Sequence, residues 1–403
     1  MLVRHPYDTY IEELAFRNGK MAFLTGPRQV GKTTLARQRL AAHGSELYHT
    51  WDDPTFRRQW IRDPQAIVPR TTGEPSVIVL DELHKAPRWK SNLKGLFDQR
   101  GADARLLITG SARLDLFRRG GDSLVGRYFL FRLHPLSIGE LVGAPVLPDQ
   151  LAAALGKKLP AHPEQLAGLL AQGGFPEPYL RGDPTFTVLW RRTRAERLVR
   201  EDLRDLSRVQ DVALIETLVA LLPERAASLL SYRSLAEDLE VAPPTARRWI
   251  EWLEQLYLVY RLSPHARDVA RSLRKQPKLY LWDWSEAPEG GARFENLVAG
   301  HLLKAVHAWT DGGLGTFELR YVRDKDQREV DFLVLRDRKP FLLVEAKASD
   351  REPARALRHF AASLRCPLVV QVVGESGVHE GFALSSKDRG WVVSADAFLG
   401  LLP

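Results

Sequence analysis

Glycines, a lysine and a threonine are spaced for phosphate chemistry in residues 26–33, which read GPRQVGKT. The spacing is Gly-x-x-x-x-Gly-Lys-Thr, set between the strand-like MAFLT and the helix-like TLARQRL, the context this motif requires. Gly26 and Gly31 let the backbone N–H groups turn inward toward phosphate oxygens, and the next helix directs its positive end at the same anion. We expect Lys32 to reach the β- and γ-phosphates of ATP and Thr33 to ligate Mg²⁺. The alternative is a chance glycine-rich turn.

A second acidic motif follows in SVIVLDELH, residues 76–84. Its four consecutive apolar residues predict a strand buried on both faces. Asp81 at the carboxyl end is expected to hold the Mg²⁺, and Glu82 to orient or deprotonate the attacking water. The alternative is an ordinary strand that ends in a solvated acidic pair. The expected nucleotide-binding residues are Gly26, Pro27, Arg28, Gln29, Val30, Gly31, Lys32, Thr33, Thr34, Asp81 and Ser111.

Hydroxyls and arginines follow the next predicted strand, LLITGS at 106–111. Thr109 and Ser111 lie at the same sheet edge as the acids, and either hydroxyl could sense the γ-phosphate. Arginine often meets the transition-state charge, from the same subunit or a neighbouring one, and the latter would require a homo-oligomer. We choose Arg127 because Gly126 allows close approach; a surface arginine is the alternative. The other candidates are Arg113, Arg118 and Arg119.

Acids and a lysine near the other end of the chain suggest a second chemistry. Residues 328–349 read REVDFLVLRDRKPFLLVEAKAS, and a hairpin with its loop at 336–340 pairs Asp331 with Glu345. Facing carboxylates repel unless one protonates or a cation lies between them, and Mg²⁺ takes carboxylate oxygens and water. Lys347, on the same face, could stabilise an attacking hydroxide or a pentavalent phosphate. That is the chemistry of metal-dependent phosphodiester cleavage.

The elements that must position these residues fall into four successive stretches. Residues 1–140 alternate β-type runs with helical patterns, which predicts an α/β fold with a mostly parallel sheet. Residues 141–230 are helical in pattern, and 231–277 give two short helices, a strand and a basic loop. Strand patterns return from 278 to 403. The fold class is therefore α/β.

The middle of the chain is basic. Residues 191–208 interleave seven arginines with acids, which favours a solvated, partly self-paired helix over a DNA contact. In 231–262, Ser234 can cap a first helix and Pro244 can start a second, at helix-turn-helix spacing. A strand and the loop 263–278 would supply a wing. The expected phosphate-contacting residues are Arg247, Arg248, Arg267, Arg271, Arg274, Lys275 and Lys278. We expect DNA as the partner, with RNA as an alternative; packing against the ATPase core alone is the other interpretation.

Composition limits the class of protein. The chain has 403 residues. Its single cysteine excludes an internal disulfide and favours a cytoplasmic protein. Its net charge of +8 favours an anionic partner. Charges interrupt every apolar stretch, and the start has no apolar secretory region, so we expect no membrane association.

Six motifs carry a resemblance to a known family. GPRQVGKTTL, VLDELHKAP, LITGSAR, SLVGR, LHPLSIGEL and GGFPEPYL occur in this order, as in AAA-type ATPases of bacteria and archaea that have an uncharacterised nuclease-like C-terminal domain. The resemblance runs over nearly the whole chain. It implies a P-loop ATPase core (1–140), a helical lid (141–230), a winged helix (231–277) and a nuclease-like domain (278–403). GGFPEPYL then resembles a lid motif that opens a helix near the nucleotide.

The acidic hairpin resembles the PD-(D/E)xK nuclease superfamily. Asp331 and Glu345-x-Lys347 match the pattern, and Glu295 in the helical FENLVAGHLL matches its upstream acid. The resemblance implies Glu295, Asp331 and Glu345 as metal ligands; VDF in place of the usual PD is a departure. Three interpretations stay open: solvated strand ends with a Glu329–Lys347 pair, a nuclease fold kept for binding, and an active nuclease. The whole chain is thus expected to be an ATP-hydrolysing, DNA-associated enzyme, or else an ATP-dependent switch or scaffold that binds a partner without cutting.

Overall fold

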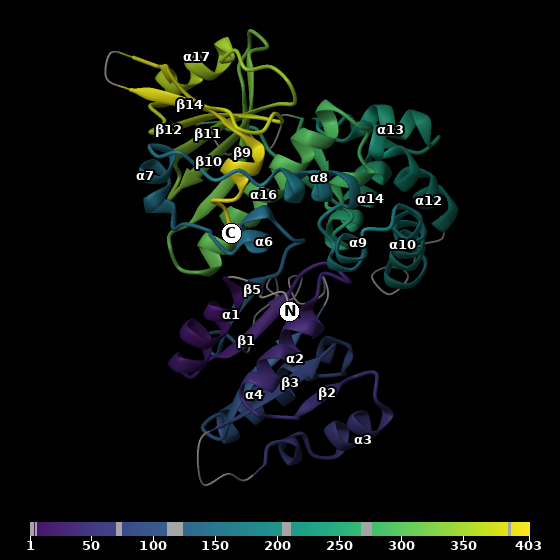
Figure 1. Cartoon of the computed structure of the whole chain (residues 1–403). Coiled ribbons are helices and arrows are strands. Elements are labelled where there is room, and N and C mark those ends of the chain that lie inside the picture. The colour runs from purple at the N-terminus through teal and green to yellow at the C-terminus, as the bar shows by residue number, and fades with distance from the viewer. Residues whose placement is uncertain are drawn as a thin grey trace. The chain divides into compact units, whose positions relative to one another are not determined.

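The computed structural model describes residues 4, 6–69, 75–110, 124–203, 211–266, 276–385 and 388–403. The chain divides into two compact units, Met1–His134 and Pro135–Pro403 (Figure 1). Within the described ranges, no helix combines the length and apolar character needed to cross a membrane.

A five-stranded sheet of order β2-β3-β4-β1-β5 forms the first unit, and every neighbouring pair is parallel. This confirms the expected mostly parallel sheet. Strands β1, β3 and β4 lie on the predicted runs MAFLT, SVIVLDELH and LLITGS. The three-residue strand β2 was not predicted, because it is too short for a periodic pattern. The strands are β1 Met21–Thr25, β2 Tyr48–Thr50, β3 Ser76–Asp81, β4 Ala104–Thr109 and β5 Tyr128–Arg132.

Helices complete the first unit. They are α1 Tyr7–Thr9, which continues into a π-helical turn at Tyr10–Ala15, α2 Lys32–Ala42, α3 Pro54–Arg62 and α4 Trp89–Arg100. Trp60 of α3 and Leu93 of α4 join Ile78 and Ile108 of the sheet in one apolar cluster. Helix α2 contacts β3 and β4. Because β3 and β4 are buried along almost their whole length, their carboxyl ends present polar side chains at one protected edge.

The second unit begins with helices, as its sequence predicts. They are α6 Ile138–Val142, α7 Leu151–Leu155, α8 Pro163–Gln172, α9 Pro176–Arg181, α10 Pro184–Arg197, α12 Val212–Leu221, α13 Tyr232–Asp238 and α14 Pro243–Gln255. An antiparallel sheet of order β6-β8-β7 accompanies them, with β6 Ser228–Leu229, β7 Val259–Leu262 and β8 Lys278–Leu281. Trp249 and Leu253 of α14 share an apolar core with Leu279 and Leu281 of β8.

Two details of the predicted helix pair were wrong. Ser231, and not Ser234, is the N-cap of α13, because the Ser231 hydroxyl accepts the Ser234 backbone N–H at 3.2 Å. Helix α14 begins at Pro243, one residue before the predicted start. Both proline positions suit a first helical turn, so the sequence alone does not choose between them.

A six-stranded mixed sheet of order β13-β14-β12-β11-β10-β9 forms the rest of the second unit. Helix α16 contacts β9, β10 and β11, while α17 contacts β10, β11 and β12 (Figure 1). The strands are β9 Phe317–Arg323, β10 Glu329–Arg336, β11 Lys339–Lys347, β12 Leu368–Val373, β13 His379–Ala383 and β14 Arg389–Ser394. The helices are α16 Gly291–Asp311, α17 Arg355–Leu364 and α18 Ala395–Leu399.

The hairpin β10–β11 has the predicted register over its centre. Leu333 pairs with Leu343, and the neighbouring pairs match on both sides. The turn is tighter than the predicted loop 336–340, because a register shift after Val334 brings Arg336 opposite Lys339. Both faces of the hairpin centre are buried, as the two-sided apolar pattern predicts.

The two later family motifs make close contacts inside the second unit. A Cβ added to Gly174 would lie 2.4 Å from the Trp284 ring, and one on Gly173 would lie 2.3 Å from Asp283 Oδ1. Only glycine therefore lets this turn approach the segment after β8 so closely. Lys304 of α16 forms a buried ion pair with Glu140 of LHPLSIGEL. The predicted placement of the glycines near a nucleotide stays a prediction.

Candidate functional site

The phosphate loop of the first unit joins β1 to α2. Gly26 has φ +144°, and a Cβ there would lie 2.2 Å from the carbonyl oxygen of Leu133. Gly31, with φ +98°, is the N-cap of α2 and has no side chain to cap it. The first-turn amides of α2 are thus directed at the space inside the loop, where an anion would be stabilised.

Lys32 lies at the start of α2 with a buried side chain. Its Nζ donates to the carbonyl oxygens of Gly26 at 2.9 Å and Pro27 at 2.6 Å. The ammonium therefore lies against the loop itself, where phosphate oxygens would be stronger acceptors than peptide carbonyls.

Asp81, at the end of β3, is the centre of a hydroxyl cluster. Thr33 Oγ1 donates to Asp81 Oδ2 at 3.0 Å, so the two expected Mg²⁺ ligands lie in contact. Tyr48 of β2 and Thr109 of β4 also donate hydroxyl hydrogen bonds to this carboxylate. Burial, together with the bond to Asp81, raises the pKa of the Tyr48 phenol well above its usual range, so it stays a donor at neutral pH. Sequence reasoning missed Tyr48, because the three-residue strand that carries it has no periodic pattern.

This donor set fits a magnesium ion bound together with a nucleotide. Mg²⁺ in phosphate-transfer sites is held by one or two protein oxygens plus substrate phosphates, and keeps several waters. Thr33 and Asp81 supply such a pair beside the loop. Thr109 is committed to Asp81 as a donor, while Ser111, the other hydroxyl considered for the γ-phosphate, lies outside the described residues.

Glu82 follows directly in a left-handed backbone conformation, with φ +55°. Its Oε2 lies 3.6 Å from His84 Nε2 and 3.4 Å from Lys85 Nζ. This turn directs the chain away from strand β3, and the carboxylate of Glu82 lies near the side chains of His84 and Lys85. Its assignment as the water-orienting residue stays a prediction.

Arg127, our choice for the transition-state arginine, is held by a local partner. Its guanidinium donates to both carboxylate oxygens of Asp98 on α4, at 2.6 and 3.0 Å. These hydrogen bonds keep the pKa of Asp98 below its usual range. The pair would have to open before Arg127 could meet a phosphate. The alternative arginines 113, 118 and 119 lie outside the described residues.

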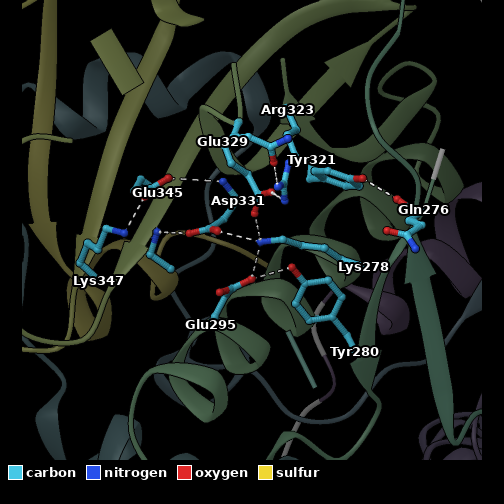
Figure 2. A network of polar contacts seen from close by, with 12 residues as sticks. Gln276, Lys278, Tyr280, Glu295, Tyr321, Arg323, Glu329, Asp331, Glu345 and Lys347 are labelled. Atoms are coloured by element: carbon cyan, nitrogen blue, oxygen red, sulfur yellow. Dashed lines mark hydrogen bonds and ion pairs between the residues drawn. The ribbon is translucent and has the colours of Figure 1, made fainter. Parts of the chain in front are cut away.

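The second candidate site is an acidic cluster in the second unit. Its members are Glu295 of α16, Glu329 and Asp331 of β10, and Glu345 of β11 (Figure 2). Asp331 and Glu345 interlock through the backbone: Asp331 Oδ2 accepts the Ala346 N–H at 3.1 Å, and Glu345 Oε2 accepts the Asp331 N–H at 3.3 Å. The side chains of Asp331 and Glu345 are both buried, as expected for a hairpin that is covered on both faces.

Lys278 of β8 brings its ammonium into the middle of this acidic cluster (Figure 2). Its Nζ lies 3.0 Å from Glu295 Oε1, 2.7 Å from Glu329 Oε1 and 3.0 Å from Asp331 Oδ1. The expectation that Lys278 faces a phosphate-contacting surface was wrong, because its side chain is only 5% exposed. Arg267, Arg271, Arg274 and Lys275 of the same basic loop lie outside the described residues.

The remaining charges pair differently from the sequence-based expectation. Lys347 lies 2.8 Å from Glu345, and Glu329 is bound by Arg323 at 2.9 Å, so the suggested Glu329–Lys347 pair is not formed. Within the described ranges, no three His, Cys, Asp or Glu side chains are grouped so that they could hold a metal ion. Glu295 and Asp331 do converge, but on the Lys278 ammonium.

Burial and mutual repulsion perturb the acids. Burial, reinforced by the charge of Asp331, raises the pKa of Glu295 to about 7 and that of Glu345 to about 7. For Lys278, burial acts to lower the pKa, but the surrounding carboxylates outweigh it and hold the ammonium charged. The cluster is therefore an ion network around a permanently charged lysine.

On the predicted DNA-contacting face, Arg247 and Arg248 lie on α14. Arg247 Nε lies 3.2 Å from Glu251, and the Arg248 guanidinium lies over the Trp252 ring. In the basic stretch before it, Arg192 pairs with Glu196, as a self-paired helix predicts, whereas Arg200 pairs with Glu216 of α12.

The fold and the loop geometry of the first unit define a P-loop nucleotide-binding core. Residues 18–142 match the family model of an AAA domain, so this part of the chain is an AAA ATPase-like domain. Residues 163–286 and 290–395 match two domains of unknown function, DUF8612 and DUF4143.

Known relatives extend the similarity beyond the core. Uncharacterized proteins of Mycobacterium tuberculosis and Mycobacterium bovis are each 25% identical over 366 residues, which cover 87% of this chain and 76% of the relative. Among solved structures, a RuvB variant from Thermotoga maritima is similar with a TM-score of 0.31 and 16% identity, covering 64% of this chain and 90% of that one. AMPPCP-bound DnaA from Aquifex aeolicus has a TM-score of 0.31 and 15% identity, over 63% and 90%. Neither structural likeness is close enough to bear on function.

Proposed function

We propose that the protein binds ATP and hydrolyses it with Mg²⁺ as an AAA-type ATPase. The observation that carries this proposal is the contact between Thr33 and Asp81 beside a glycine loop that holds Lys32. Lys32 would exchange its two loop carbonyls for phosphate oxygens, and the loop amides would bind the remaining phosphate oxygens. The wider binding set stays as proposed from the sequence: Gly26, Pro27, Arg28, Gln29, Val30, Gly31, Lys32, Thr33, Thr34, Asp81 and Ser111.

The hydrolytic step is assigned to groups at the edge of the sheet. Mg²⁺, when bound by Thr33 and Asp81, neutralises charge on the phosphate oxygens. Glu82, held 3.4 Å from Lys85 Nζ, would orient the attacking water. Arg127 would leave Asp98 to meet the γ-phosphate, a change that ATP binding would have to favour.

Substitution of the loop lysine tests the ATPase proposal. Lys32→Ala should abolish phosphate release from ATP, because it removes the ammonium that would bind the β- and γ-phosphates. Arg57→Ala is the control: it removes an exposed cation from α3 of the same unit, away from the proposed nucleotide-binding residues, so turnover should persist. Normal turnover by Lys32→Ala would overturn the assignment.

We also propose that the middle of the chain is a winged helix that binds DNA. Support comes from the succession α13, α14, β7 and β8 and from the exposed arginines of α14. Phosphate contacts predict an affinity that falls steeply with salt. Arg247→Ala with Arg248→Ala should weaken duplex binding and reduce the salt slope by roughly two, while Arg233→Ala on α13 should not. No binding to DNA at about 50 mM salt, or binding insensitive to salt, would contradict this; tighter binding to RNA would reassign the partner.

For the C-terminal part, 278–403, the proposal is a PD-(D/E)xK-like domain with Asp331, Glu345 and Lys347 as the candidate catalytic residues. The four-part division at 140, 230 and 277 is likewise proposed. Plasmid nicking in Mg²⁺ by the wild type, Asp331→Ala and Lys347→Ala tests cleavage; equal activity in all three removes it.

One observation favours a second function, an ATP-dependent switch or scaffold that binds without cutting. Lys278 already neutralises the acids that cleavage would use to hold a metal. A chain that does not cut DNA but still binds it in an ATP-dependent manner would support the switch or scaffold over the nuclease.

A further inference from the structure

We infer that the Lys278 ammonium takes the place of a divalent cation in the acidic cluster, so that the cluster binds no Mg²⁺ in the arrangement of this structure. The inference goes beyond the proposed ATPase and holds whether or not the first unit turns over ATP.

The geometry suits an ammonium and not a metal. A lysine Nζ has three N–H donors and no acceptor, and three carboxylates meet Lys278 at 2.7–3.0 Å. These are lengths of charge-assisted hydrogen bonds, whereas Mg²⁺ demands oxygens at about 2.0–2.1 Å in octahedral geometry. The acids are therefore spaced around a donor, and a metal at the same point would need all of them to move inward.

Every carboxylate of the cluster also has a second donor. Tyr280 donates to Glu295 at 2.8 Å, Arg323 lies 2.9 Å from Glu329, and the Ala346 N–H binds Asp331 at 3.1 Å. Glu345 is bound by Lys347 at 2.8 Å and by the Asp331 N–H at 3.3 Å. These donors already compensate much of the carboxylates' charge, and a metal would bring a double positive charge beside a buried ammonium.

Strand β8 fixes the ammonium in this position. Lys278 pairs in the sheet with Leu262 of β7 and Leu229 of β6, so its backbone is held from both sides. Its side chain then crosses to acids on α16 and β10, which belong to a different sheet layer of the same unit. The lysine is thus a fixed part of the fold that links the three-stranded sheet to the six-stranded one.

Counting of bound Mn²⁺ by electron paramagnetic resonance tests the inference on the full, nucleotide-free chain. We expect the wild type and Asp331→Asn to bind the same amount of Mn²⁺, because the cluster takes none. Lys278→Ala should gain one bound Mn²⁺ per chain, and Lys278→Ala with Asp331→Asn should lose it. Any weak Mn²⁺ binding at Thr33 and Asp81 is common to these four proteins, so it cancels when their Mn²⁺ counts are compared.

Lys304→Ala removes another buried lysine, one that is paired with Glu140 outside the acidic cluster, so it should gain no Mn²⁺. Wild-type Mn²⁺ binding that falls on Asp331→Asn would overturn the inference, and this comparison needs no change at Lys278. A folded Lys278→Ala that gains no Mn²⁺ would overturn it too, because the acids would then not form a cation site that the lysine fills.

Discussion

Replacement of Lys278 by methionine should strongly destabilise the second unit at alkaline pH. Lys278→Met keeps an unbranched side chain as far as the ε position but removes the ammonium that three carboxylates share. Breaking a buried ion pair by removal of one partner costs about 3–5 kcal/mol. Glu295 and Glu329 are 17% and 23% exposed, and water can relieve part of the loss, so we take the lower end, about 3 kcal/mol. For a unit of this size the melting temperature should fall by roughly 6–12 °C.

The loss should depend on pH with a definite sign. Burial raises the pKa of Glu295 to about 7 in the folded chain, above the value of an exposed glutamate. A carboxyl raised in this way stabilises the fold fully below its unfolded pKa, and the contribution is lost as pH rises through the folded value. Lys278 lowers the pKa of Glu295, so removal of Lys278 should raise this folded pKa further. The gap between Lys278→Met and the wild type should therefore be widest near pH 8 and narrow toward about pH 5, where Glu295 is protonated.

Thermal unfolding followed by circular dichroism between about pH 5 and pH 8.5 measures this gap. The exposed Lys339, on β11, gives the control: Lys339→Met should match the wild type at every pH. Lys278→Met with Asp331→Asn should recover part of the stability at high pH, since one uncompensated charge is gone. Equal melting temperatures for Lys278→Met and the wild type at pH 8, or a gap that widens as pH falls, would refute the proposed ion network.

Three further outcomes test the first unit. Tyr48→Phe removes one donor to Asp81 and should cut ATP turnover or Mg²⁺ affinity by about 10-fold or more, with folding intact; an unchanged Mg²⁺ titration would contradict this role. Gly26→Ala should destabilise the unit in urea unfolding by clearly more than Gly19→Ala, because both glycines have positive φ but only the first would clash, at 2.2 Å from Leu133; similar losses would refute the steric argument. Arg127→Ala should lower turnover by about 10³-fold while Asp98→Ala leaves it within a few fold, and equal effects would reduce the arginine to a surface pair.

Much of the fold could be predicted because it is encoded locally. The strand patterns of the first 140 residues predict the parallel sheet, and the glycine spacing of 26–33 predicts a tight turn. The structure adds the reason for Gly26, since a Cβ at this position would lie 2.2 Å from the Leu133 carbonyl oxygen. The pairing of Leu333 with Leu343 follows from the apolar alternation of one hairpin. Short elements without a period, such as β2, were missed.

Contacts between distant segments could not be predicted in the same way. Tyr48 reaches Asp81 from a strand 33 positions earlier, and Arg127 meets Asp98 across 29 positions. Single residues of this kind have no periodic signal, since their role depends on which strands become neighbours and on which face each side chain lies. The predicted cap at Ser234 failed for a smaller reason, because two serines three positions apart can both begin the same helix.

The sequence by itself determined the residue types: a phosphate loop with a partner acid, and a hairpin that carries Asp331 on one strand and Glu345 on the other. Only the tertiary structure decided what lies among the acids. Lys278 is 17 positions from Glu295 and 53 from Asp331, and it meets both because β8 passes beside α16 and β10. The spacing of Asp331 and Glu345 in the sequence predicts that these carboxylates need a cation. The packing of strand β8 decides that this cation is Lys278 of the chain itself.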